Sequence, residues 1–220
     1  METNNQRKTP TVLVPYDFGP KAKTALQEAI KVADFIKGQI YLLSVLQASN
    51  FFTELFKSEK QQREERRHVE NKLKEVILET RKTYHGNIRY IVEHGSPAEV
   101  ILEQAQIRNA QYIIMGKMSS TVSAFHFIGP LTMHIIASAP CPVITVSENS
   151  IENGRFDNIL LPIDLSKQTL EKINAAISWA KYYKSTVHLV GVVKRGTNLV
   201  SSRLVKKHEK AKWVIEQEGI

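Results

Sequence analysis

The residues best placed to do chemistry stand where short apolar segments end. Residues 112–115 form a nearly all-apolar run, and Gly116 follows directly. A strand end followed by glycine and a helix start suits phosphate in parallel sheets, because backbone N–H groups and the helix dipole both favour an anion. Glycine is also common in such turns without any ligand, owing to its backbone freedom. Gly116 alone therefore leaves both roles open.

Asp17 follows another short apolar run, residues 11–15, near the start of the chain. If that run is a central strand, the Asp17 carboxylate faces the same crevice as Gly116 and could accept hydrogen bonds from a ribose or a base. A carboxylate at this place can also cap the helix that follows, which is the commoner role. In both interpretations Asp17 and Gly116 are expected to lie side by side.

The remaining reactive side chains form no recognisable set. His126 and His134 are eight residues apart and His94 belongs to another segment, so the pattern does not indicate converging metal ligands. The single cysteine, Cys141, stands between two prolines before an apolar run, which favours a buried structural thiol over a redox role. No Ser/His/Asp or Cys/His set has the context of an activated nucleophile. We therefore expect no catalytic residue, no metal and no enzyme activity.

Strand and helix patterns alternate along the chain. Short apolar or alternating runs predict strands at 11–15, 40–46, 88–92, 112–115 and 143–146. Apolar residues at three- and four-residue spacing predict helices near 22–33, within 54–84, from 97 onward and near 131–137. Ser96 is expected to be an N-cap and Pro97 the first helical residue. This order predicts an α/β fold with an open, doubly wound parallel sheet in a three-layer, Rossmann-like sandwich.

The first strand–helix–strand pattern recurs 147 residues later, where Asp164 matches Asp17. Nine residues repeat at this spacing without a gap: Leu13, Pro15, Asp17, Ala29, Ile30, Ala33, Lys37, Leu42 and Val45 recur as Leu160, Pro162, Asp164, Ala176, Ile177, Ala180, Lys184, Leu189 and Val192. These identities predict an internal duplication, with a complete domain at 1–148, a linker at 149–156 and a partial second copy at 157–220. Two parallel strands with parts of two helices are too small to bury a core of their own. The second copy is therefore expected to pack against a partner.

The composition narrows the class of protein. The chain has 220 residues, of which 42% are hydrophobic, enough for one or two domains. No apolar run approaches a membrane span, and residues 1–10 lack a secretory apolar region, so a cytoplasmic location is expected. The net charge is +8, and residues 194–220 supply +4 of it from seven basic and three acidic residues. The rest of the chain is only mildly basic and has no basic stripe interleaved with aromatic residues. For the tail, a solvated helix face is favoured over a nucleic-acid surface.

Several segments resemble the universal stress protein family. Residues 12–17 are similar to the family's opening strand, hydrophobic-x-hydrophobic-Pro-x-Asp, and residues 95–101 to its G-x-P-x-x-x-I segment. Residues 112–116 and 139–143 are similar to its fourth and last strands. The similarity covers residues 11–146 and restarts from 157 to about 193. It implies the adenine nucleotide alpha hydrolase-like version of the predicted fold, in a tandem member whose second domain is incomplete.

The same resemblance implies a nucleotide site that fits only in part. ATP-binding members carry G-x2-G-x9-G-[S/T] after the fourth strand. Gly116 and Gly129 match the first and third glycines, whereas Ser119 replaces the second glycine and Pro130 the serine or threonine. Proline has neither an N–H nor a hydroxyl, so two possible phosphate donors are lost. The expected cofactor-binding residues are Pro15, Asp17, Val45, Met115, Gly116, Ser119, Gly129 and Pro130, with ATP or AMP as the possible ligand.

Three functions are consistent with these observations. The first is a non-enzymatic stress-response or regulatory module with a degenerate adenine-nucleotide site. The second is a switch that binds ATP and hydrolyses it slowly, using the crevice of Asp17, Gly116 and Gly129. The third, which the sequence favours least, is an adaptor that binds nucleic acid or an acidic partner through its basic tail. Residues 143–146 should form a sheet edge, and the family pairs this strand with its equivalent, so a homodimer through Val143–Val146 is expected.

Overall fold

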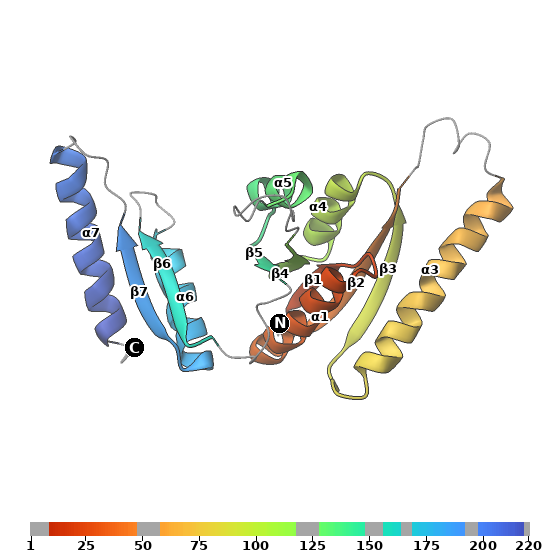
Figure 1. Cartoon of the computed structure of the whole chain (residues 1–220), viewed down its shortest axis with the longest axis horizontal. Helices are drawn as coiled ribbons and strands as arrows, with labels where there is room; N and C mark the ends of the chain where they lie inside the picture. The colour runs from red at the N-terminus through yellow and green to blue at the C-terminus, as the bar shows by residue number, and fades with distance from the viewer. Residues whose placement is uncertain are drawn as a thin grey trace, which may run out of the picture. The chain divides into compact units, whose positions relative to one another are not determined.

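The chain forms two units, residues 1–151 and 152–220, each with its own parallel sheet (Figure 1). The computed structural model describes residues 9–47, 58–117, 128–147, 156–163, 169–191 and 198–217. None of the described helices combines the length and the apolar character that a membrane crossing requires. Most of the predicted linker lies outside the described residues.

Strands and helices alternate throughout the first unit. In chain order these are β1 (Thr11–Pro15), α1 (Pro20–Ile36), β2 (Gln39–Leu46), α3 (Glu59–Thr80), β3 (Ile88–His94), α4 (Pro97–Ile107), β4 (Tyr112–Gly116), α5 (Pro130–Ser138) and β5 (Val143–Val146). The sheet has the order β3-β2-β1-β4-β5, and every neighbouring pair is parallel. The predicted α/β fold with a parallel sheet is confirmed, and β5 lies at one edge of the sheet, as expected.

The sheet is buried on both faces. One face carries Leu13, Leu43 and Ile113, which pack in one cluster with α4 and α5. The opposite face contacts α1 and α3. β1 is the centre of this arrangement, because Val12, Leu13 and Val14 are all fully buried. A strand that is apolar on both sides suits such a doubly covered position.

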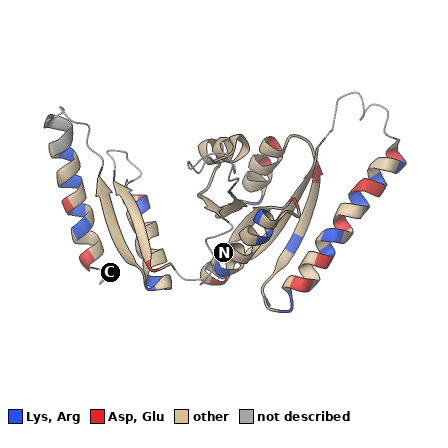
Figure 2. Cartoon of the chain, viewed as in Figure 1, with Lys and Arg blue, Asp and Glu red and all other residues tan. Residues whose placement is uncertain are grey.

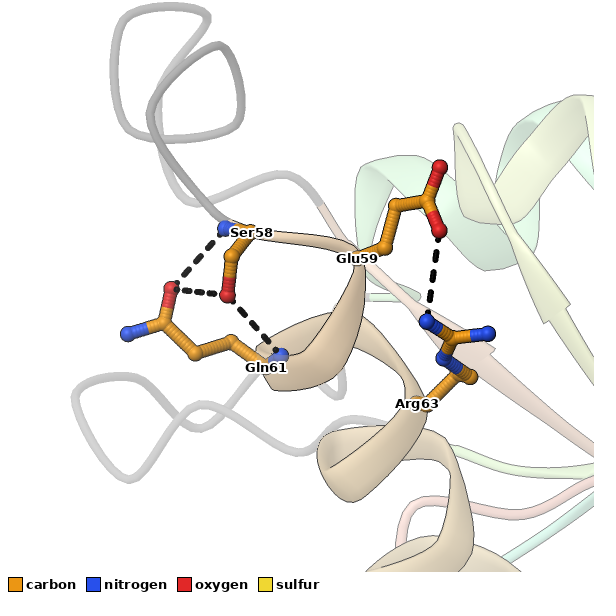
Figure 3. A network of polar contacts seen from close by, with 4 residues as sticks. All are labelled: Ser58, Glu59, Gln61 and Arg63. Atoms are coloured by element: carbon orange, nitrogen blue, oxygen red, sulfur yellow. Dashed lines mark hydrogen bonds and ion pairs between the residues drawn. The ribbon is translucent and has the colours of Figure 1, made fainter.

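The long helix α3 begins at a capping box, in which two residues satisfy each other's backbone groups (Figure 3). The Gln61 backbone N–H donates to Ser58 Oγ at 3.3 Å, and the Ser58 N–H donates to Gln61 Oε1 at 2.9 Å. An ion pair of 3.2 Å between Arg63 and Glu59 adds to the first turn. The helix is polar on most sides and buries only Leu73 and Ile77, which belong to the apolar stripe that the sequence predicts.

Ser96 shows where a local prediction holds only in part. It is the N-cap of α4 and Pro97 is the first helical residue, as expected. Its side chain makes no capping hydrogen bond, however. The extended backbone of Ser96 and the preset φ of Pro97 therefore start this helix without help from the hydroxyl.

The second unit contains β6 (Asn158–Ile163), α6 (Thr169–Tyr183), β7 (Thr186–Gly191) and α7 (Asn198–Gln217), with β6 and β7 parallel. Its local geometry repeats that of the first unit at the same spacing. Lys37 and Lys184 both adopt a left-handed backbone, with φ of 54° and 58°. Just after α1, the N–H of Gly38 donates to Ala33 O at 2.8 Å; just after α6, that of Ser185 donates to Ala180 O at 3.0 Å.

The sheet of the second unit is covered on one face only within its own described residues. Leu161 and Ile163 are buried with residues of α6 and α7. On the other face Leu160 is 67% exposed and Val190 is 36% exposed. At the matching position of the first unit, Leu13 is fully buried beneath α4 and α5. The elements that cover Leu13 have no counterpart among the described residues of the second unit.

This difference predicts opposite outcomes for two equal truncations. Leu13→Ala should lower the free energy of unfolding by about 2–5 kcal/mol, because it leaves a cavity in a packed core. Leu160→Ala should change it by no more than about 0.5 kcal/mol, because the side chain is exposed. Urea unfolding followed by far-UV circular dichroism measures both. A cost for Leu160→Ala as large as that for Leu13→Ala would mean that this face is covered in solution.

Candidate functional site

A cleft of about 260 Å³ opens at the carboxyl ends of β1, β2 and β4. We call it the strand-tip cleft. It is lined by residues of these strand ends and of the first turns of α1, α4 and α5: Pro15, Tyr16, Asp17, Lys21, Ala22, Leu43, Ser44, Val45, Gln47, Pro97, Ile101, Met115, Gly116, Gly129, Pro130, Leu131 and Thr132. Parallel α/β sheets bind ligands at this place, where the order of the strands reverses on either side of the first strand.

Seven of the eight cofactor-binding residues expected from the sequence line the strand-tip cleft: Pro15, Asp17, Val45, Met115, Gly116, Gly129 and Pro130. The eighth, Ser119, lies outside the described residues. Asp164, which the predicted duplication matches to Asp17, also lies outside them. The structure therefore brings the seven residues together, while their contact with a nucleotide remains a prediction.

Gly116 allows the first turn of α1 to approach the end of β4. A Cβ atom added to Gly116 would lie 2.6 Å from Lys21 Cβ and 2.7 Å from the Lys21 carbonyl oxygen. Contacts that short with backbone require something to move. The absence of a side chain at Gly116 therefore fixes the position of the Lys21 backbone at the floor of the cleft, whether or not a ligand is present.

Asp17 serves the local structure. Its Oδ1 accepts a hydrogen bond of 2.9 Å from the N–H of Gly19, the N-cap residue of α1. Asp17 therefore closes the turn that leads into α1, whereas Gly19 is the N-cap and no side-chain capping hydrogen bond is made, so the helix-capping role that the sequence favours is wrong. Within the described part of the chain its Oδ2 has no hydrogen-bond partner, and the side chain is exposed at the cleft. One carboxylate oxygen thus holds the turn and the other faces solvent.

The turn that carries Asp17 is tightly constrained. Phe18 has a left-handed backbone with φ of 67°, which is uncommon for a residue with a Cβ. Its ring packs edge-on against Tyr16, with 5.4 Å between ring centroids. Burial, and secondarily the nearby Asp17 charge, raises the pKa of Tyr16 above its usual value, so its hydroxyl stays protonated at neutral pH. These contacts make the Asp17 turn a rigid wall of the cleft.

The start of α5 offers few donors. Gly129 is its N-cap and Pro130 its first residue, which has no N–H. Thr132, buried in the same turn, also lines the cleft. Two residues after Pro130, Thr132 supplies the kind of hydroxyl group that proline lacks. The glycine motif that starts at Gly116 did not point to Thr132, because in that motif the hydroxyl residue directly follows the third glycine.

Lys21 is a second residue that the sequence reasoning missed. Its half-buried side chain lines the strand-tip cleft and is the one cation among the described residues that line it. Within the described residues it has no ion-pair partner. An amine at a helix start can bind phosphate as a point charge. One sequence feature could have identified Lys21 as a cleft residue: it directly follows Pro20, in the first turn of the helix after Asp17.

The described histidine and cysteine side chains form no metal site. No group of three or more His, Cys, Asp and Glu within the described residues could hold a metal ion, and His126 lies outside these residues. Cys141 is free and partly buried against the core beneath α4 and α5. Burial raises the pKa of its thiol, which lowers the fraction of Cys141 present as thiolate at neutral pH. This environment is that of a packing residue.

The fold and the cleft define a class: parallel α/β proteins with a ligand crevice at the strand tips. The profile of the universal stress protein family matches residues 8–147. The chain therefore belongs to the universal stress protein family.

Individual relatives agree with this assignment. Universal stress protein MJ0531 of Methanocaldococcus jannaschii is 24% identical over 156 residues, which cover 66% of this chain and 86% of that one. The structure of universal stress protein UspA from Lactobacillus plantarum is 22% identical with a TM-score of 0.53, over 63% of this chain and 98% of that one. A universal stress protein from Archaeoglobus fulgidus is 17% identical with a TM-score of 0.68, over 92% and 74% of the two chains. These likenesses support the fold.

Proposed function

We propose that this universal stress protein is a non-enzymatic regulatory module whose strand-tip cleft binds an adenine nucleotide. The observation that carries the proposal is the lining of the cleft. Seven residues chosen for nucleotide binding from separate parts of the sequence meet around one cavity, and Lys21 adds a positive charge there. The single cysteine allows no disulfide within the chain, which is consistent with a cytoplasmic location for such a module.

The donors in the cleft favour a nucleotide with one phosphate over a triphosphate. Pro130 removes an N–H and a hydroxyl from the start of α5, and among the described lining residues Lys21 carries the one positive charge. A monophosphate needs fewer neutralising groups than the three linked phosphates of ATP. The Asp17 Oδ2 would accept hydrogen bonds from the sugar. The cleft thus suits sensing of AMP better than hydrolysis of ATP.

Calorimetric titration of the full chain with AMP and with ATP plus magnesium tests the proposal. We expect saturable binding of AMP that Lys21→Ala weakens about tenfold or more, which corresponds to about 1.4 kcal/mol. Lys23→Ala is the matched control, because Lys23 is an exposed lysine of the same helix that does not line the cleft. Asp17→Ala is less informative, since it also removes the hydrogen bond to Gly19.

The other outcomes separate the alternatives. No binding of either nucleotide at millimolar concentration would overturn the proposal. Tighter binding of ATP than of AMP, with release of phosphate, would replace it with the ATP-hydrolysing switch. Equal losses of AMP affinity in Lys21→Ala and Lys23→Ala would show that the ligand is bound by a general electrostatic effect and not by the cleft.

We further propose that the second unit is a partial copy of the first and that the chain forms a homodimer through β5. Nine identities at a spacing of 147 residues, together with the matching helix ends at Lys37 and Lys184, support the copy. β5 is a short edge strand in which three of the four residues are apolar, and such an edge invites pairing. A two-fold axis beside β5 would join the edges of two chains antiparallel.

A proline at an outward-facing position tests the dimer. The N–H of Ile113 donates to Pro142 O and that of Lys117 to Val146 O, so the even-numbered residues of β5 face β4. Thr145 therefore directs its N–H to the open edge, and Thr145→Pro should leave the sheet intact and block pairing. Light scattering at tens of micromolar should show a dimer for the native chain and a monomer for the variant. A native monomer, or a dimer that survives Thr145→Pro, would contradict this interface.

A further inference from the structure

A second groove lies far from the strand tips, between α3 and the outer strand β3. It has a volume of about 480 Å³ and is lined by three cations and four apolar or aromatic residues: Lys74, Arg81, Arg89, Ile77, Leu78, Ile88 and Tyr90. We call it the edge groove. Figure 1 shows the two elements that form it, with α3 running alongside β3. None of the lining residues is acidic.

The cations of the edge groove lack acidic partners. Figure 2 shows that α3 carries basic and acidic residues along its length. Several of its cations form ion pairs on the helix itself: Arg63 with Glu59, Arg66 with Glu70 and, just after the helix, Lys82 with Glu79. Within the described residues, neither Lys74 nor Arg81 has an ion-pair partner. The groove therefore collects positive charge that the helix leaves uncompensated.

Arg89 lines the groove from the strand side, but its side chain turns to the other face of the sheet. Its guanidinium donates to the Tyr41 hydroxyl at 3.3 Å and to Asn87 Oδ1 at 3.4 Å. Both partners are neutral, so they orient the guanidinium and leave its charge in place. Tyr41 packs in the cluster beneath α4 and α5, so the Arg89 guanidinium lies on the face of the sheet opposite α3. An anion in the groove would thus meet Lys74 and Arg81 on the helix side. Beside these cations the groove has an apolar surface that includes Leu78, which is 64% exposed.

The backbone of β3 adds hydrogen-bonding capacity. β3 is the last strand of the sheet on this side, and no described strand pairs with its outer edge. The N–H of Ile40 donates to Asn87 O at 2.8 Å and that of Gly95 donates to Leu46 O at 3.1 Å, so the odd-numbered residues face β2. The backbone groups of Ile88, Tyr90 and Val92 therefore point to the open edge, because alternate residues of a strand face opposite sides.

We propose that the edge groove binds an acidic peptide segment of a partner protein, which adds a strand to β3 beneath α3. A groove between an edge strand and a helix is a known arrangement for strand addition, in which the main chain supplies affinity and alternate side chains supply specificity. The backbone of Tyr90 would pair with the peptide. Carboxylates of the peptide would meet Lys74 and Arg81, and its apolar side chains would cover Leu78.

The charges decide which strand can be added. Charged side chains on an edge strand oppose pairing between like edges. A second copy of β3 would bring Glu93 as well as Arg89 to the same edge and so gains nothing from Lys74 and Arg81, whereas an acidic strand is attracted by these two cations. A fatty acid or a nucleotide could pair its anionic group with the cations, but it would leave the backbone N–H and C=O groups at the open edge of β3 without hydrogen bonds. The open backbone of β3, the apolar surface and the two cations on the helix side together favour an acidic extended peptide.

The test uses the full chain and a fluorescein-labelled seven-residue peptide of alternating glutamate and valine, titrated by fluorescence anisotropy. We expect saturable binding that Lys74→Glu with Arg81→Glu weakens at least tenfold. The matched control is Lys60→Glu with Arg67→Glu, which makes the same charge change at exposed residues of α3 outside the groove and should weaken binding less than threefold. A peptide with lysine in place of glutamate should not bind.

Tyr90→Pro tests the strand addition itself. The Tyr90 N–H faces the open edge, so its loss leaves the pairing with β2 intact and should not change the circular dichroism spectrum. Binding of the glutamate–valine peptide should be lost. Unchanged binding by Tyr90→Pro would overturn strand addition, and equal losses in the two charge variants would overturn the groove as the site. No binding at 1 mM peptide, or self-association of the native chain that Tyr90→Pro abolishes, would overturn the proposed occupant.

Discussion

The close contact between the first turn of α1 and the end of β4 governs the rest of the first unit. Gly116 has no Cβ, and the backbone of Lys21 occupies the space that one would fill. This contact brings the start of α1 against the tip of β4 and leaves the Lys21 side chain in the strand-tip cleft. The hydrogen bond from Gly19 to Asp17 holds the same helix start from the other side. The wall of the cleft is therefore a consequence of packing.

Much of this arrangement could be predicted from sequence. Strand and helix periods alternate clearly, and parallel strands bring their carboxyl ends to one edge of a sheet, so residues after β1 and β4 had to meet. Lys21 and Thr132 could not be predicted in the same way, because their direction depends on how each helix is rotated about its axis. The edge groove was also hidden, since the order of the strands places β3 at the rim and local patterns do not reveal that order.

The two units show how the same local pattern leads to different surfaces. Leu13 and Leu160 occupy matching positions, yet the first is fully buried and the second is 67% exposed. The difference comes from α4 and α5, which cover Leu13 and have no described equivalent in the second unit. Identical strand residues therefore say little about burial unless the covering helices are known. Asp17 shows the same limit. Its sequence position predicts that it lies at the cleft, but does not reveal that one of its carboxylate oxygens is bonded within the turn.

The substitution Gly116→Ala tests the central contact most directly. An added methyl group must push against the Lys21 backbone, so the account predicts a loss of about 1–3 kcal/mol in the free energy of unfolding. It also predicts weaker AMP binding, because Lys21 moves. Gly191→Ala, where an added Cβ would meet its nearest neighbour at an ordinary 3.5 Å, should leave the stability nearly unchanged. A Gly116→Ala variant as stable as the native chain, with unchanged affinity for AMP, would contradict the account.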